Sequence, residues 1–440
     1  MKKNLLGVKG MNDLLPSSSK LWAETEKRIK HLFMSYGYEE IRTPILENTD
    51  LFARGIGEVT DIVEKEMYSF TDQLNGDSLT LRPENTAAIV RAVTEHNLTY
   101  SGPKKLWYYG PMFRHERPQR GRYRQFNQFG IEAFGFDDPL IEAEQLFLIN
   151  RLWNTIGVKK NSMPKLELNC LGSSQERLKY KVALIEYFSK YIDDLDQDSK
   201  RRLKTNPLRI LDSKNPDLEG VISGSPKLSG FLGEGSKFKF EKLCELLDGF
   251  GMNFELNLNL VRGLDYYNHT VFEWKHESLG AQSTVCAGGR YDSLVQIIGG
   301  KPTPAFGFAI GMERLIDLVI KFETINSFDN LDLYVVHMGE KARVKAMVFS
   351  ETIRDAGLKV KVDTTNANIK SQMKKAGLSG AQYVAIFGDS ELELGCVTIR
   401  PLGLNYNQNK SSQKSVPLEN VSEFLLNALN NSEKYTCEKT

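Results

Sequence analysis

The stretch FRHERPQRGRYRQFNQFGIE, residues 113–132, is the most informative part of the chain. Its five arginines stand beside aromatic and acidic residues, and Pro118 and Gly121 indicate a turn between two strand-like runs. Because side chains alternate along a strand, every second residue of the later run shares one face. That face carries a cation, an aromatic ring, an amide and a carboxylate, on Arg124, Phe126, Gln128, Gly130 and Glu132. Such a face indicates a polar ligand, and the arginines indicate phosphate or carboxylate.

Four more short segments combine glycines with charged or aromatic residues. They are GMNDLLP at 10–16, RGLDYY at 262–267, AGGRYD at 287–292 and GFAIGMER at 307–314. Residues 113–132 and 307–314 resemble motifs 2 and 3 of the class II aminoacyl-tRNA synthetases. Residues 262–267 and 287–292 closely resemble two signatures peculiar to histidyl-tRNA synthetases, and 10–16 resembles the usual opening of that family. Five such segments in order are very specific.

This resemblance covers the chain from about Gly7 to the last helix. It implies an α+β fold, with a class II synthetase-like antiparallel sheet flanked by helices, a helical insertion and a C-terminal α/β domain. It also implies histidine–tRNA ligase activity: L-histidine would be activated with ATP and then transferred to the 3′ end of tRNA(His). AMP and pyrophosphate would be released.

Changes of pattern along the chain predict its domains, and 440 residues suffice for two or three. Residues 176–251 are charged and helical in pattern, and they interrupt the interval between motifs 2 and 3. Beyond a short polar linker at 327–330, strands alternate with helices, which is typical of an independent α/β domain. The expected divisions are a catalytic domain at 1–170 and 256–326, an insertion at 171–255, an anticodon-binding-like domain at 331–430 and a polar tail at 431–440.

Two local patterns precede motif 2. An amphipathic helix is predicted over Ser17–Tyr36, followed by a strand over Tyr38–Leu46 that contains Pro44. The pair resembles motif 1, the dimer interface of class II synthetases, so the resemblance implies a homodimer. Taken alone, the pair is equally an ordinary helix–strand packing unit. Asn-Gly at 75–76 predicts the turn of a hairpin over Met67–Arg82.

The bulk composition narrows the class of protein. Charged residues make up 26% of the chain, and 57 basic side chains nearly balance 56 acidic ones. RNA binding must therefore come from local patches. No apolar run approaches the ~20 residues of a membrane helix, and polar residues soon follow Met1, so we expect neither a membrane partner nor export.

Cysteine and histidine are sparse. The five cysteines are scattered without a CxxC pair, and the six histidines form no metal-ligand cluster. We therefore expect no metal site from a protein motif and a reducing, cytoplasmic location. Mg²⁺ is expected only as the companion of ATP, which is itself a substrate.

Three arginines are predicted to act on ATP. The resemblance assigns Arg114 to the histidine carboxylate and the α-phosphate, and Arg262 to the opposite side of that phosphate. Both would be catalytic, since fixed cations stabilise the charge that develops there. It places adenine between Phe126 and Arg314, with Arg314 also reaching the γ-phosphate. From the residues alone, Arg262 could instead pair with Asp265 in a turn.

A selective histidine site needs a partner for each imidazole nitrogen and a carboxylate for the ammonium group. The resemblance assigns Glu132 and Tyr267 to the imidazole. The remaining predicted pocket residues are Glu84, Asn85, Thr86, Arg114, Gln128, Arg262, Tyr266 and Tyr291, of which Glu84, Thr86 and Gln128 would hold the ammonium group. Asn85 stands where glycine is common in the family. Glu84 also suits the N-terminus of a helix, and the two roles are compatible.

The basic loop of motif 2 is predicted to meet the acceptor end of tRNA through Arg117, Arg120 and Arg122. Lysines also make residues 341–375 locally basic, as phosphate contact requires, although most could be ordinary solvated positions. Two other functions stay open. A histidine-sensing regulatory paralogue commonly lacks the C-terminal domain, which this chain has, and another class IIa synthetase would lack the signatures at 262–267 and 287–292.

Overall fold

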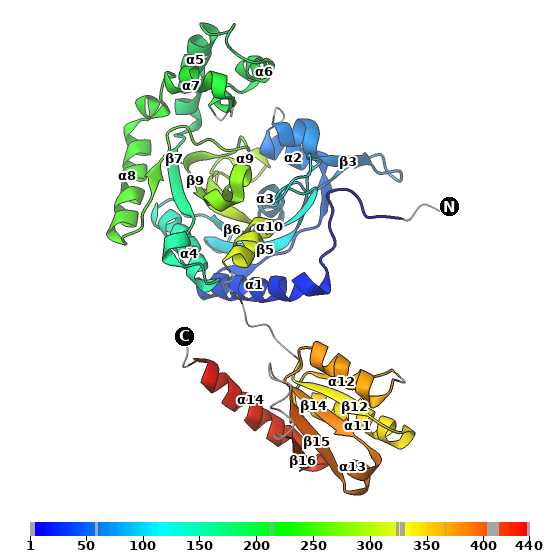
Figure 1. The fold of residues 1–440 in the computed structure, drawn as a ribbon. Coiled ribbons are helices and arrows are strands. Elements are labelled where there is room, and N and C mark those ends of the chain that lie inside the picture. Colours follow the sequence, from blue (N-terminus) through cyan, green and yellow to red (C-terminus); the bar gives the residue numbers. More distant parts are fainter. Residues whose placement is uncertain are drawn as a thin grey trace. The chain divides into compact units, whose positions relative to one another are not determined.

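The computed structural model describes residues 5–57, 60–211, 213, 215–322, 325, 331–365, 367–402 and 413–437. The chain forms two compact units, Met1–Asn326 and Ser327–Thr440 (Figure 1). The predicted linker at 327–330 lies outside the described residues.

The first unit is built on an eight-stranded sheet with the order β1-β5-β6-β11-β10-β9-β7-β8. The strands are β1 (Glu39–Glu40), β5 (Lys104–Phe113), β6 (Gln125–Phe134), β7 (Lys165–Cys170), β8 (Glu255–Leu256), β9 (Asn268–Lys275), β10 (Thr284–Arg290) and β11 (Ala305–Gly311). The central pairs are antiparallel, and only the edge pairs β1–β5 and β7–β8 are parallel. The predicted antiparallel class II synthetase-like sheet is therefore confirmed.

Motif 2 forms the hairpin of β5 and β6, as predicted. Its strands pair along their full length, from Lys104 opposite Phe134 to Phe113 opposite Gln125. The turn closes between Gln119 and Arg122, and Gly121 at φ +70° supplies the left-handed backbone that other residues avoid. The hairpin therefore carries Arg114 at the end of one strand and the polar face of β6 on the other.

Helices cover both faces of this sheet (Figure 1). Helix α1 buries Phe33, which meets Trp107, Phe129 and Phe308 of three strands edge-on. Those strand residues alternate with Gln128 and Glu132, so α1 covers the face away from the predicted site. The helices of the catalytic part are α1 (Pro16–Ser35), α2 (Thr49–Ile56), α3 (Thr86–Glu95), α4 (Leu140–Thr155), α9 (Leu294–Ile297) and α10 (Met312–Lys321).

A small three-stranded sheet with the order β2-β4-β3 precedes α3. Its strands are β2 (Leu46–Asn48), β3 (Tyr68–Thr71) and β4 (Ser78–Leu81). The predicted hairpin is confirmed as β3 and β4, with Gly76 at φ +82° in its turn. The prediction of one strand over Tyr38–Leu46 is wrong, because β1 and β2 join different sheets. Pro44 lies between them and has no N–H to donate to a ladder.

Residues 171–255 form a helical layer beside β7. Its helices are α5 (Ser174–Ser189), α6 (Gln197–Thr205), α7 (Glu219–Ser223) and α8 (Glu234–Gly249). Ser173 and Glu176 form a reciprocal capping box at the start of α5, and the Asp196 carboxylate caps α6. Tyr180, Leu184 and Phe188 bury the inner face of α5.

The C-terminal unit contains a five-stranded sheet with the order β13-β12-β14-β15-β16. Its elements are β12 (Leu333–His337), α11 (Glu340–Asp355), β13 (Val360–Val362), α12 (Ile369–Leu378), β14 (Tyr383–Phe387), α13 (Asp389–Glu393), β15 (Cys396–Pro401), β16 (Lys414–Pro417) and α14 (Val421–Cys437). β13, β12 and β14 are parallel, and β15 and β16 are antiparallel additions. The predicted α/β alternation is confirmed, whereas the sequence analysis missed α13 and β16. Helix α14 continues into the segment predicted as a tail.

None of the helices described in either unit is both long enough and apolar enough to cross a membrane.

Candidate active site

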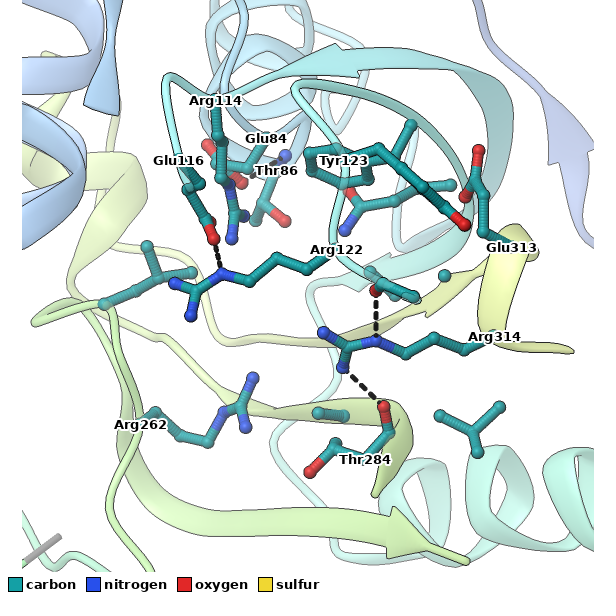
Figure 2. Close-up of a pocket in the computed structure, with 18 of the residues that line it drawn as sticks. Glu84, Thr86, Arg114, Glu116, Arg122, Tyr123, Arg262, Thr284, Glu313 and Arg314 are labelled. Atoms are coloured by element: carbon teal, nitrogen blue, oxygen red, sulfur yellow. Dashed lines mark hydrogen bonds and ion pairs between the residues drawn. The ribbon is translucent and has the colours of Figure 1, made fainter. Parts of the chain in front are cut away.

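A cavity of about 180 Å³ opens on the face of the large sheet opposite α1 (Figure 2). Four of the recognised segments contribute to its wall: motif 2, the signature at 262–267, the signature at 287–292 through Ala287, and motif 3. Glu84 and Thr86 complete the wall. The predicted residues that line it are Glu84, Thr86, Arg114, Arg122, Phe126, Gln128, Arg262, Tyr266, Tyr267 and Arg314. Segments separated by more than 200 residues in the sequence therefore meet at one site.

Arg114 follows β5 directly and turns back towards α3. Its Nε donates to the carbonyl oxygen of Pro83 at 2.9 Å, and its guanidinium group lies 5.2 Å from the centre of the Phe126 ring. Burial lowers the pKa of Arg114, against the opposing effect of Glu66 and Glu84. The Arg114 side chain is thus fixed at the cavity wall by one hydrogen bond and one aromatic ring.

Arg262 approaches from the opposite side, on the loop before β9 (Figure 2). Its Nη1 pairs with Glu273, and its guanidinium group lies 5.7 Å from the centre of the Tyr267 ring. Its Nε is buried without a hydrogen-bond partner among the described residues. The alternative that the residues alone left open was a pair with Asp265; the structure instead holds Arg262 against Glu273 on β9.

Arg314 lies in the first turn of α10. It donates to two backbone carbonyls, Gly121 at 2.9 Å and Thr284 at 2.6 Å (Figure 2). Burial, and then the nearby cations Arg114 and Arg122, lower its pKa to about 10. The side chain bridges the motif 2 turn and β10, and it lines the cavity between them.

Glu84 stands at the N-terminus of α3. Its carboxylate accepts the N–H groups of Thr86 at 2.7 Å and Ala87 at 2.9 Å, and the Tyr266 hydroxyl lies 3.4 Å away. Burial raises the pKa of Glu84 despite these hydrogen bonds. The expected helix-terminal position and a cavity-lining position are therefore both present in one side chain.

Gln128 lines the cavity from the centre of β6. Its Oε1 is buried and has no hydrogen-bond partner among the described residues. Because an unpaired buried polar atom is costly, such an atom in a cavity wall marks a place where a ligand donor fits.

Glu132 lies one hydrogen bond behind the cavity wall. Its Oε1 accepts the Thr86 hydroxyl at 2.7 Å, and its Oε2 accepts the Tyr291 hydroxyl. Burial raises the pKa of Glu132 to about 8 despite both hydrogen bonds. Glu132 faces Gly307 on β11, where an added Cβ would lie 1.8 Å from Oε2. The glycine of motif 3 therefore provides the space for this carboxylate.

Three tyrosines from the two histidine signatures form one aromatic group. The ring centres of Tyr266 and Tyr267 are 4.7 Å apart, and Tyr291 lies 5.7 Å from the first and 6.4 Å from the second. Burial raises the pKa of Tyr267 to about 12. Tyr266 and Tyr267 line the cavity, whereas Tyr291 lies behind them with Glu132.

Asn85 is oriented differently from its neighbours. Its Oδ1 accepts the Thr43 hydroxyl at 2.7 Å and Arg82 Nη1 at 3.1 Å, and Asn85 is not among the residues that line the cavity. The side chain therefore fixes the entry to α3 rather than offering a group to a ligand.

The predicted RNA-binding arginines divide into two kinds. Arg117 is exposed, and Arg120 is exposed with Nε 3.2 Å from Asp317. Arg122 lines the cavity and pairs with Glu116 (Figure 2). In this structure the turn of motif 2 thus places two arginines outward and one inward.

The sequence analysis overlooked several residues at the site. Glu313 lines the cavity beside Arg314 and accepts the backbone N–H of Asn127 at 2.8 Å, and burial raises its pKa to about 7. Glu116, Tyr123 and Thr284 also line it. Glu313 and Glu116 belong to the recognised motifs and could have been considered there, whereas nothing local marked Thr284, which contributes a backbone carbonyl.

Across the described ranges, no three histidine, cysteine or acidic side chains are grouped as a metal ion would require.

Comparisons with known proteins agree with this geometry. A family model described as histidyl-tRNA synthetase matches residues 10–315, and one described as an anticodon binding domain matches residues 332–428. The chain belongs to the histidyl-tRNA synthetase family. The matched range of the histidyl-tRNA synthetase model includes every motif that lines the cavity.

Similar full-length proteins carry the same designation. Histidine–tRNA ligases from Burkholderia mallei and Paraburkholderia xenovorans are each 53% identical over 432 residues, which is 97% of this chain and 96% of theirs. The crystal structure of apo S. aureus histidyl-tRNA synthetase is similar with a TM-score of 0.78 and 36% identity, over 96% of this chain and all of that one. The resemblance to the histidyl-tRNA synthetase family is thereby confirmed.

Proposed function

We propose that this chain is a histidine–tRNA ligase that makes histidyl-adenylate from L-histidine and ATP and transfers the histidyl group to tRNA(His). The observation that carries the proposal is the cavity in which Arg114, Arg262 and Arg314 meet a carboxylate and an amide, Glu84 and Gln128. Cations suit a triphosphate and a carboxylate, and the acidic and amide groups suit an ammonium group. The 53% identity to named histidine–tRNA ligases supports the same activity.

In the first step the histidine carboxylate oxygen attacks the α-phosphorus of ATP, and pyrophosphate leaves. Arg114 and Arg262 stand on opposite walls of the cavity, which suits them to hold the α-phosphate between them (Figure 2). Their side chains are fixed beforehand by Pro83 and Glu273, so little reorganisation is needed as charge develops. We propose Phe126 and Arg314 as the partners of adenine.

Recognition of the amino acid is assigned to the inner end of the cavity. Glu84, Thr86 and the unpaired Oε1 of Gln128 would accept the three N–H bonds of the ammonium group. Tyr266 and Tyr267, backed by Glu132 and Tyr291, would receive the imidazole and its two nitrogens. Asn85 is not part of this proposed contact set, because its side chain is engaged by Thr43 and Arg82.

In the second step a hydroxyl of the terminal ribose of tRNA attacks the carbonyl carbon of the adenylate, and AMP leaves. The exposed Arg117 and Arg120 suit contact with the acceptor end, and the C-terminal unit suits the anticodon region. Arg122 would contribute from inside the cavity. A cytoplasmic location belongs to the proposal, because charged tRNA is consumed by translation.

Mg²⁺ is proposed as the companion of ATP. Magnesium is commonly held by one or two carboxylates together with substrate phosphates. Glu116 and Glu313 are carboxylates in the cavity wall and would hold it, where it would neutralise triphosphate charge.

The decisive test is amino-acid-dependent exchange of pyrophosphate into ATP, measured separately with all twenty amino acids. We expect exchange with histidine alone, because analogues leave the buried polar groups of the pocket unpaired. Exchange with another amino acid and none with histidine would refute the proposal. A histidine-sensing paralogue would bind histidine without exchange, and the intact arginines of the cavity argue against that alternative.

We also propose a homodimer, because Ser17–Leu46 resembles motif 1. Light scattering at micromolar concentration should give about twice the 49.9 kDa chain mass. A fully active monomer would contradict this part of the proposal.

A further inference from the structure

The loop that carries the first histidine signature, residues 260–267, is not part of any β-strand and so is not held by strand pairing. Residues 260–267 run between β8 and β9 in irregular backbone, yet four of them, Arg262, Leu264, Tyr266 and Tyr267, line the cavity. The side chains of such a loop can hold a substrate in a precise position only if the loop backbone is itself fixed. Its backbone carbonyls therefore need hydrogen-bond donors. Those donors come from another part of the unit.

Two arginines of the helical insertion donate hydrogen bonds to backbone carbonyls of this loop. Arg177 of α5 donates through Nη1 to the Tyr267 carbonyl and, at 3.5 Å, to the Asp265 carbonyl. Arg209 donates through Nη2 to the Gly263 carbonyl. The insertion therefore contacts the backbone directly after Arg262 and at Tyr267, two of the residues that line the cavity.

Asp265 is the fixed point in the middle of the loop. Its Oδ1 accepts Asn206 Nδ2 at 2.9 Å, and its N–H donates to the Ile56 carbonyl at 3.0 Å. Gly57 has φ +107° beside it, and an added Cβ there would lie 3.0 Å from Asp265 Oδ2. Asp265 thus joins the loop to the end of α2 on one side and to the insertion on the other.

The insertion residues are themselves tied together. Arg202 Nη1 of α6 donates to the Arg209 carbonyl at 3.1 Å, and Asn206 is only 6% exposed at the junction after α6. Burial lowers the pKa of Arg177, with Asp265 opposing the effect. Contacts made in such partly desolvated surroundings are strong enough to fix a loop.

We propose that Arg177, Asn206 and Arg209 are positioning residues for histidine activation. They hold residues 263–267 so that Arg262 reaches the α-phosphate and Tyr267 reaches the imidazole. The insertion would then set the efficiency of the first chemical step, before any tRNA binds. The inference rests on the proposed function and assigns part of the activation machinery to a domain outside the catalytic sheet.

The two arginines should fail in different ways, because they hold opposite ends of the loop. Arg209→Ala frees the carbonyl next to Arg262, so the kcat of histidine-dependent exchange should fall about tenfold to a hundredfold with little change in the KM for histidine. Arg177→Ala frees the carbonyl of Tyr267, so the KM for histidine should rise about tenfold. Arg209→Lys should recover part of the lost kcat, since it keeps a cationic donor.

A matched control is available on the same face of the insertion. Arg201 of α6 pairs with Glu64 at 2.7 Å across the same boundary, but no contact joins it to residues 260–267 in the described structure. Arg201→Ala should leave both kcat and KM within about twofold of wild type. Thermal unfolding of every variant reports whether the fold is intact.

A double-mutant cycle tests whether Arg209 acts through Arg262. If it does, Arg209→Ala should cost the Arg262→Ala enzyme less than about twofold, although it costs the wild type far more. Additive losses, or losses that appear only as a lower fraction of folded enzyme with unchanged kinetic constants, would overturn the inference. Absence of histidine-dependent exchange in the wild type would refute the proposed function instead, so the two failures are distinguishable.

Discussion

The cations proposed to act on substrates in the two units lie in different surroundings. In the first unit, Arg290 is 1% exposed and pairs with Glu142 at 2.6 Å, and Glu132 is equally buried behind the cavity wall. In the C-terminal unit the core around Val335, Phe387 and Ile399 is apolar, Asp363 is buried and pairs with Lys375, and cations such as Lys370 and Lys374 are exposed.

This difference corresponds to two kinds of electrostatic work. A cation fixed in a desolvated site strongly stabilises charge that develops at one atom, so removing that single cation causes a large loss of rate. Exposed cations attract a phosphate backbone weakly and additively, and salt screens them. We therefore expect single substitutions to be severe in the cavity and mild on the C-terminal unit.

The largest single-residue effect is expected for Arg262→Ala. Loss of one fixed transition-state donor should lower histidyl-adenylate formation by about 10²–10³-fold in single-turnover measurements, with histidine binding partly retained. Arg42→Ala is the control, because Arg42 is an exposed arginine that pairs with Glu40. Equal rates for Arg262→Ala and wild type would remove Arg262 from the proposed chemistry and weaken the contrast between the units.

Deleting residues 331–440 should separate the two steps. Every residue proposed for activation precedes residue 315, so histidine-dependent exchange should stay within about threefold of wild type, whereas tRNA charging should fall by more than about tenfold at physiological salt. The charging defect should shrink at low salt. Both activities are measured on one preparation, and equal charging by the truncated and full-length proteins would exclude an RNA-binding role for this unit.

Glu132, the buried acid behind the cavity wall, should make the stability of the fold depend on pH. Burial raises the pKa of Glu132 from 4.5 to about 8. Between these values the folded state keeps a proton that the unfolded chain has released, so this contribution to stability falls as the pH rises. From pH 6 to pH 8, the free energy of unfolding of wild type minus that of Glu132→Gln should fall on the order of 2 kcal/mol in urea titrations.

Glu176→Gln is the control for this titration. Although burial acts in the opposite direction, hydrogen bonds from Ser173, Ser236 and Gly233 hold the pKa of Glu176 at about 2. Its stabilising effect is lost only as the pH falls towards that value, so the difference from wild type should stay constant between pH 6 and pH 8. A constant difference for Glu132→Gln as well would contradict the raised pKa.

The smallest effects are expected for single lysines of the C-terminal unit. Lys370→Ala or Lys374→Ala should weaken tRNA binding less than about tenfold and reduce the dependence of log K on log salt by about 1 if the lysine contacts a phosphate. Lys20→Ala, an exposed lysine of α1, should leave that dependence unchanged. A hundredfold loss from one lysine would mean that this unit also uses a fixed, specific cation.

Sequence patterns predicted those parts of the structure whose signals are local. The hairpin of motif 2 followed from strand alternation and the turn at Gly121, and α1 followed from helical periodicity. The division of Tyr38–Leu46 between two sheets could not be predicted, because strand pairing depends on partners far away in the sequence.

The same distinction holds at the site. Family motifs predicted that Arg114, Gln128 and Tyr267 belong to the site, and all three line the cavity. The sequence did not show which residues hold these functional groups in place. Glu273 pairs with Arg262 only because β9 returns beside the loop, and Arg177 reaches that loop from a helix almost 90 residues earlier. Such contacts depend on tertiary packing, for which neither periodicity nor composition carries a signal.

Gly307 has a consequence for anyone who wishes to redesign the amino-acid preference. Because it has no side chain and faces Glu132 across the ladder, no truncation at this position can enlarge the pocket around Glu132. Room for a bulkier imidazole analogue must come from shortening a ring such as Tyr291, which also removes a donor to Glu132. Enlarging the pocket at Tyr291 therefore also removes a hydrogen bond to the Glu132 carboxylate. Mutant libraries that vary Tyr291 should vary Glu132 with it.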